Sequence, residues 1–360
     1  MKKILTTIQK EANKILLFTV LAGTMAACDS VLDFDEGDCT IEYCVKFKYD
    51  YNIQNENTFA KEVKNITLYA FDDNNNLVYQ KAESGDMLAE EDYAMSLDVE
   101  PGDYHLIAWA GLNDDSYAVP LLTPKSSRIN DLNVKLLRKN SGDLSRAAEE
   151  EKDKFIVEQE LSTLWHGELT KSSFTRSGRQ RFTEVSLVKN TNHIRVALVQ
   201  VVKDKNKTVT RALNKDDLKF AIYDNNGYMN YDNSLLDDDL LTYKPYTTEQ
   251  SSVTTKAFNV VDTEYPAVIV DMSVARLMKD QNPELSIIDT RTNKSILKTG
   301  DLINYIELLR VEKYPDMPQQ EYLDRESNYD ISIFVDENLT LISTVIEINA
   351  WVIQINDFEL

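Results

Sequence analysis

The sequence predicts an all-β protein built from two tandem β-sandwich domains with short helical insertions. Segments such as Val45–Tyr51 alternate apolar and polar residues, which is the period-two pattern of a half-buried strand. Such segments are short, and turn residues separate them at intervals of roughly 8 to 12 residues, which is typical of sandwiches. The 360-residue chain shows neither a βαβ rhythm nor a fixed-period repeat, and its hydrophobic content of 42% is enough for two cores.

Strands are expected in the first half wherever apolar alternation is bounded by turn residues. Asp72–Asn76 lies between two such segments, so the sequence predicts a hairpin there. Tyr104–Ala110 is apolar enough to be buried on both faces. The polar, charged residues 139–154 are expected to form a loop inside the first domain, because strand-like sequence resumes at Leu164. The strands expected in this half are 45–51, 66–71, 77–79, 95–99, 104–110 and 132–136.

The second half continues the same pattern. Phe182–Val188 and Ile194–Val202 are expected to form a hairpin about Asn190–Asn192, since asparagine favours turns. Leu302–Leu309 has apolar residues at helical spacing and predicts a short helix. Further strands are expected at 220–223, 267–272 and within 339–355. The basic, polar stretch Thr170–Arg181 places the predicted boundary between a first domain, 39–178, and a second, 179–360.

The N-terminus has the features of a lipoprotein signal. Lys2 and Lys3 precede a short apolar run, and the small Ala26 and Ala27 stand directly before Cys28. We therefore expect a signal peptide over 1–27, a lipid on the Cys28 thiol, and an acidic tether over 28–38. An ordinary signal peptide and a membrane span are the alternatives. A span needs roughly 20 apolar residues, and this run is about half as long.

Composition excludes some partners. The formal net charge of −21 argues against nucleic acid and anionic lipid, because both would repel the chain. Outside the cytoplasm Cys39 and Cys44 could form a disulfide; the alternative is two reduced thiols near the first strand. His105, His166 and His193 lie far apart in sequence, so no zinc site is expected.

No motif of a catalytic or cofactor site stands out. The G-x-S-x-G, H-E-x-x-H and phosphate-binding glycine patterns are missing from the sequence. We therefore expect no catalytic residue, no metal and no cofactor. Asp/Asn-rich segments at 72–76, 224–233 and 237–239 favour turns, because Asn and Asp tolerate left-handed backbone. Calcium binding is the alternative for these segments, although none has EF-hand spacing.

Several segments in order resemble the minor fimbrillin lipoproteins, the anchor subunits of type V fimbriae. They are Val45–Asn52, Ile66–Asp72, Pro101–Tyr104 with Ala108–Leu112, Trp165–Gly167, Gln320–Glu326 and Ile348–Ile353. The resemblance implies two transthyretin-like β-sandwich domains, no enzymatic activity, and a role at the base of a cell-surface fimbria on the outer membrane. Its partners would be fimbrillin subunits. His166 and Arg325, which belong to these segments, would be structural.

The arginine pattern separates an anchor from a stalk subunit. Stalk subunits of this family look to be matured by an arginine-specific protease that removes the lipidated segment and the first strand. Here no arginine precedes Arg128, so the lipid and the first strand should stay attached.

The C-terminal segment is a candidate donor strand. Ile346, Ile348, Ala350 and Val352 would lie on one face of a strand that could complete a partner's sheet. The alternative is that this strand pairs within its own domain. At the level of function, the alternatives to an anchor are a surface glycan- or ligand-binding lipoprotein and a lipid-tethered hydrolase.

Overall fold

The computed structural model describes residues 43–141, 151–176, 181–201, 212–255, 263–298, 302–348 and 351–355. The predicted signal peptide, Cys28 and the acidic tether lie outside the described residues. The described strands form four sheets, of seven, six, six and three strands, which confirms the all-β prediction. The described residues within 43–175 and 182–355 belong to one compact unit.

The first sheet contains most of the strands expected in the first half, in the order β3-β2-β5-β10-β11-β1-β4. The β2–β3 hairpin is confirmed. β5 lies between β2 and β10. The burial expected for Tyr104–Ala110 holds for Leu106–Ala110, whereas Tyr104 and His105 are only partly buried. The strands are β1 (Tyr43–Lys48), β2 (Asn65–Phe71), β3 (Leu77–Ser84), β4 (Met95–Leu97), β5 (Gly102–Ala110), β10 (Trp165–Phe174) and β11 (Arg181–Lys189).

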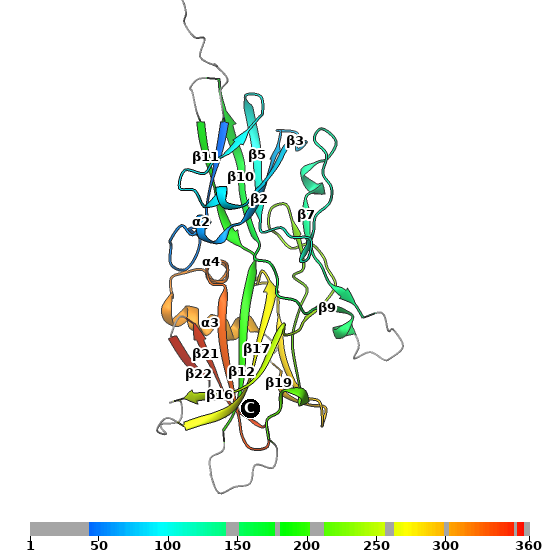
Figure 1. Cartoon of the computed structure of the whole chain (residues 1–360), viewed down its shortest axis with the longest axis vertical. Coiled ribbons are helices and arrows are strands. Elements are labelled where there is room, and N and C mark those ends of the chain that lie inside the picture. The colour runs from blue at the N-terminus through cyan, green and yellow to red at the C-terminus, as the bar shows by residue number, and fades with distance from the viewer. Residues whose placement is uncertain are drawn as a thin grey trace, which may run out of the picture. The chain divides into compact units, whose positions relative to one another are not determined.

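The second sheet has the order β16-β17-β12-β20-β21-β22, and its central strands β12 and β20 run parallel (Figure 1). Parallel neighbours require a long crossover connection, and here residues 201–327 supply it. The strands are β12 (Thr191–Gln200), β16 (Thr247–Thr255), β17 (Thr263–Ala275), β20 (Asn328–Val335), β21 (Leu341–Ile348) and β22 (Trp351–Ile355).

The other two sheets combine strands from both halves of the sequence. One has the order β19-β18-β13-β15-β9-β8 and the other β14-β7-β6. Their strands are β6 (Tyr117–Ala118), β7 (Asn133–Leu136), β8 (Lys139–Asn140), β9 (Phe155–Val157), β13 (Leu218–Asp224), β14 (Tyr228–Asn230), β15 (Leu241–Tyr243), β18 (Glu284–Asp289) and β19 (Lys294–Lys298). The two halves therefore do not form wholly separate sheets: β9 pairs with β15, and β14 pairs with β7.

Short helices connect the strands. The predicted helix is confirmed as α3 (Leu302–Lys313), whose Leu302, Ile303, Ile306 and Leu309 are buried. The other helical segments are α2 (Phe59–Glu62), α4 (Gln319–Arg325) and the short turns η1 (Asp86–Ala89), η2 (Ile129–Asp131), η3 (Glu151–Asp153) and η4 (Lys215–Asp217). One hydrophobic cluster contains residues from both halves, including Trp109, Tyr243 and Tyr329.

The predicted hairpin between residues 182–188 and 194–202 is wrong. β11 belongs to the first sheet and β12 to the second. Asn190, between them, is fully buried, and its side-chain amide pairs reciprocally with that of Asn233. The asparagines that suggested a hairpin turn thus mark the passage from one sheet to the next. Since β11 continues the first sheet to Lys189, we propose that the domain boundary lies at Asn190, beyond the expected 178/179.

Candidate functional site

The first described strand, which follows the predicted tether, is an interior strand of the first sheet. β1 lies between β11 and β4, and Tyr43, Val45 and Phe47 are buried. The Phe47 ring stacks on Phe59 at 5.9 Å and on Tyr93 at 6.3 Å between centroids. Each such side chain contributes roughly 1.5–3 kcal/mol when it is fully buried. Removal of β1 would therefore expose much of this core and leave a gap in the sheet between β11 and β4.

The first arginine of the chain lies well beyond this strand. Arg128 is exposed at the start of η2, and β1 to β6 all precede it. A cut at Arg128 would therefore separate six strands from the rest of the chain, whereas the cut expected for a stalk subunit would remove the lipidated segment and one strand.

The cysteines are only partly within the described residues. Cys44 is buried on β1, with 4% of its surface exposed. Cys28 and Cys39 fall outside the described residues. The Cys28 lipid and the Cys39–Cys44 disulfide therefore stay predictions.

The C-terminal segment forms two paired strands in place of the single strand expected. β21 pairs with β20, and β22 folds back on β21. The register places Ile346 opposite Ile331 and Ile353, whereas Val352 stands opposite Glu347. The four proposed donor residues, Ile346, Ile348, Ala350 and Val352, are thus not one continuous alternation; Ala350 falls between the strands, outside the described residues. Asn349, a residue type that favours turns, precedes Ala350. Donation to a partner stays a prediction.

The Trp165-His166-Gly167 motif opens β10 and packs in the interior. The His166 ring lies 2.7 Å from the Tyr231 carbonyl oxygen and meets the Trp109 ring edge-on at 4.7 Å. Burial lowers the pKa of His166 to about 4, so the ring is neutral at neutral pH. A Cβ on Gly167 would stand 2.5 Å from a Val185 methyl carbon, which explains the glycine. The motif is a packing element.

The Gln320–Glu326 motif forms α4 and carries a nearly buried ion pair. Nε and Nη2 of Arg276 each donate to a different carboxylate oxygen of Asp324 at 2.8 Å. The remaining Nη1 donates to the Asn233 carbonyl at 2.8 Å. Only 11% of the Arg276 and 8% of the Asp324 side chain is exposed, so solvent screens this bidentate pair weakly.

α4 also contacts the loop that follows β1. Arg325 donates to the Asn52 carbonyl and to Asn55 Oδ1, and its guanidinium lies 4.0 Å from the centre of the Tyr51 ring. The backbone N–H of Ile53 donates to the Arg325 carbonyl at 3.0 Å. Two motifs far apart in sequence, 45–52 and 320–326, therefore meet, and Arg325 has the structural position that the resemblance implies.

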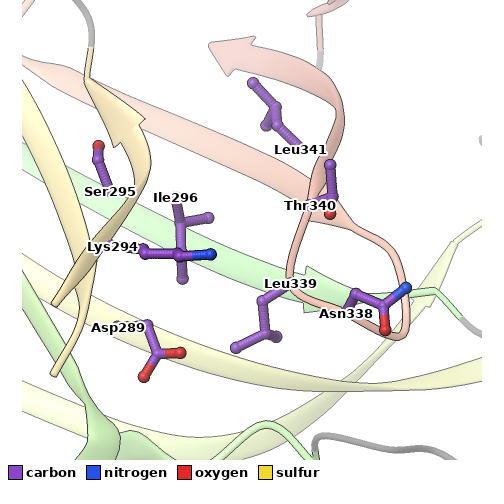
Figure 2. Close-up of a pocket in the computed structure, with 8 residues that line it drawn as sticks. All are labelled: Asp289, Lys294, Ser295, Ile296, Asn338, Leu339, Thr340 and Leu341. Atoms are coloured by element: carbon purple, nitrogen blue, oxygen red, sulfur yellow. The ribbon is translucent and has the colours of Figure 1, made fainter. Parts of the chain in front are cut away.

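A cavity of about 560 Å³ lies between β19 and the β20–β21 turn (Figure 2). Ile296, Leu339 and Leu341 supply its apolar surface, and the Lys294 amine is its basic group (Figure 2). Leu339 adopts a left-handed backbone with φ of 63°, fixed because the Asp336 carboxylate accepts the N–H groups on both sides of it. The lining residues are Asp289, Lys294, Ser295, Ile296, Asn338, Leu339, Thr340 and Leu341. The lining thus combines an apolar surface with polar and charged groups, as binding pockets commonly do.

The Asp/Asn-rich turn at 72–76 has the predicted turn chemistry. Asp72 Oδ1 accepts the N–H groups of Asn74 and Asn76 at 2.9 and 2.8 Å, and Asn75 has a left-handed φ of 62°. Within the described part of the chain, no group of three or more His, Cys, Asp or Glu side chains is arranged to hold a metal ion. None of the helices in that part is long and apolar enough to cross a membrane.

Comparison with known protein families finds one that matches most of the chain. Residues 35–357 match the family described as fimbrillin-A associated anchor proteins Mfa1 and Mfa2. No curated protein sequence matches the chain.

Three solved structures are similar to this protein over most of the chain. A proposed polysaccharide-binding protein of Bacteroides thetaiotaomicron is 31% identical, with a TM-score of 0.71 over 88% of this chain and 99% of that one. A proposed adhesin of the same species is also 31% identical, with a TM-score of 0.71 over 87% and 97%. The fimbrial anchor protein Mfa2 of Porphyromonas gingivalis shares the fold, with 16% identity and a TM-score of 0.59 over 87% and 99%.

Proposed function

Because the chain belongs to the family of fimbrillin-A associated anchor proteins, we propose that it is the lipid-tethered anchor subunit at the base of a cell-surface fimbria. Family membership makes it a fimbria-associated protein at the cell surface, of a structural and not an enzymatic family. The proposal adds attachment to the outer membrane through a lipid on Cys28 and assembly with fimbrillin subunits.

The position of β1 is the observation that carries the proposal. An anchor must keep its lipidated N-terminus, and here the strand that follows the tether is buried between β11 and β4. The sequence between Cys28 and β1 offers no arginine to an arginine-specific protease. The lipid and the folded domain therefore stay joined, and β1 keeps its place in the sheet between β11 and β4.

Donation of the C-terminal strand is the second part of the proposal. β22 is the edge strand of its sheet, and among the described strands it pairs only with β21, so its departure breaks one ladder of five residue pairs. The released segment could then pair with a neighbouring subunit by backbone hydrogen bonds.

The alternative is a surface lipoprotein that binds a glycan or another ligand. The cavity beside β19 favours it, because polar side chains there surround an apolar surface. The proposed polysaccharide-binding relative supports the same alternative.

Cys28→Ser tests the attachment. Cells that carry this substitution should release both the protein and its fimbriae into the medium, measured by fractionation and electron microscopy. Ser30→Ala, two residues away, is the matched control and should leave both attached. Fimbriae that stay firmly attached to Cys28→Ser cells would contradict the anchor function.

Deletion of residues 351–360 tests strand donation while β21 is retained. The truncated protein should reach the cell surface and unfold in a cooperative thermal transition, yet fail to hold fimbriae. If the truncated protein holds fimbriae as firmly as the intact one, the C-terminal strand is not the donor.

A further inference from the structure

The described sheets protect their edges to different degrees. An exposed edge strand presents unpaired N–H and C=O groups, and proteins usually blunt such edges with short strands, lysines, prolines or bulges. β4 has three residues and β8 has two. β3 contains Lys81, and its pairing with β2 has a register shift. β19 begins and ends with lysine and has a shifted register with β18. These four edges therefore carry such protection.

β16 has none of these protections. It pairs with β17 at nine consecutive positions, from Thr247↔Asp271 to Thr255↔Thr263, with no register shift. Its sequence, TTEQSSVTT, contains neither proline nor lysine, and Glu249 is its only charged residue. Residues 247–252 are all exposed. In the described part of the chain, β17 is its only strand partner.

Hydrogen bonds of the Gln250 side chain also hold the middle of the strand. Gln250 Oε1 accepts the backbone N–H of Lys215 at 2.9 Å, and its Nε2 donates to the carbonyls of Leu213 and Ala267 at 3.4 and 3.3 Å. These bonds fix the middle of β16 through one face of the sheet. A partner that pairs with the free edge therefore orders little additional chain, which lowers the entropic cost of binding.

We propose that the free edge of β16 binds an extended segment of a different polypeptide, which adds to the second sheet as another strand. A row of alternating donors and acceptors is complementary to an extended backbone. Glu249 is the only charged residue of β16, so the incoming strand carries lysine or arginine opposite Glu249. A second copy of this chain is a poor occupant, because two proteins with a net charge of −21 repel each other.

This inference is independent of the proposed donation by the C-terminal strand. β16 and β22 lie at opposite ends of the six-stranded sheet. The C-terminal strand would leave this chain, whereas the β16 edge would receive a strand from outside. Failure of either proposal leaves the other standing.

A synthetic peptide provides the probe. A fluorescein-labelled heptapeptide of alternating threonine and valine with a central lysine is titrated with the mature protein and followed by fluorescence anisotropy. Hydrogen exchange then locates the site: bound peptide should slow amide exchange in Thr247–Val253 and leave β3 unchanged. The same peptide N-methylated at alternate residues lacks the edge donors and should not bind.

A charge swap tests the predicted orientation. Glu249→Lys should weaken binding of the lysine peptide about tenfold, and a glutamate-centred peptide should bind this variant better than the wild type. Lys81→Glu, on the protected β3 edge, is the matched control and should change neither affinity.

Three results of these peptide experiments would overturn the inference, and a fourth, from sedimentation, would do so as well. They are equal binding of the N-methylated peptide, an affinity unaffected by Glu249→Lys, and exchange protection confined to residues outside β16. Sedimentation that shows self-association abolished by Glu249→Lys would make a second copy the occupant and would equally refute a distinct partner.

Discussion

Replacing Asp224 by asparagine should stabilise the protein above neutral pH. Asp224 ends β13 with 4% of its surface exposed, and its Oδ1 accepts the Asn225 N–H at 2.9 Å. Within the described structure its Oδ2 is buried and has no hydrogen-bond partner. Burial disfavours the charged carboxylate and raises the pKa of Asp224 to about 7. The folded protein therefore keeps a proton that the unfolded chain releases near pH 4.

The size of the effect follows from the two pKa values. The pKa rises from 3.8 in the unfolded chain to about 7 in the fold. About three pKa units at about 1.4 kcal/mol each give roughly 4 kcal/mol. Because the folded-state pKa is the higher one, stability is full below pH 4, falls as pH rises to 7, and is then constant. Asparagine keeps the acceptor for Asn225 and removes the charge, so it escapes this loss.

Urea unfolding followed by tryptophan fluorescence at pH 4 to 8 measures the effect. The free energy of unfolding of Asp224→Asn, relative to wild type, should rise by roughly 4 kcal/mol across this range. Asp280→Asn, an exposed control in the same half of the chain, should show a constant difference. An unchanged difference between pH 4 and pH 8 for Asp224→Asn would refute the reasoning.

Three further experiments test the packing. Gly111→Ala should lower the free energy of unfolding by more than about 2 kcal/mol, because the new Cβ would overlap the Thr163 carbonyl oxygen. Gly85→Ala should lower it less, because no atom lies close to the new Cβ there. Arg276→Met alone should cost about 3–5 kcal/mol in urea unfolding, and adding Asp324→Leu should recover part of it; additive losses would contradict this coupling. The pKa of His166 is lowered from 6.5 to about 4, so the unfolded chain takes up a proton that the folded protein does not, and stability falls as pH drops from 6.5 to 4. His166→Gln should flatten this decline in the same assay.

Local patterns in the sequence predicted local structure well. The β2–β3 hairpin follows from two alternating segments around Asp72–Asn76, since both strands and their turn lie within one short stretch. The pairing of β9 with β15, and of β14 with β7, joins segments about 85 to 95 residues apart. Alternation identifies a strand and its two faces but not its distant neighbour, so these pairings could not be predicted.

The errors arose where a local sequence pattern typical of one structure occurs in another. Asn190 and Asn192 look like turn residues, but Asn190 is buried and its amide pairs with Asn233. Residues 346–352 look like one strand, but the chain reverses between β21 and β22. The position of β1 between β11 and β4, which carries the proposed function, depends on distant partners and was visible only in the structure.

The interior position of β1 has a mechanical consequence. A chain held by its lipidated N-terminus would receive force at Tyr43, where the described part of the first sheet begins. A pull along the axis of β1 loads its hydrogen bonds to β4 and β11 together, in shear, so several must break at once. An edge strand peeled from one end would instead lose its bonds one after another. Under the proposed lipid anchoring, β1 would thus also be placed to resist being drawn out of the fold under load.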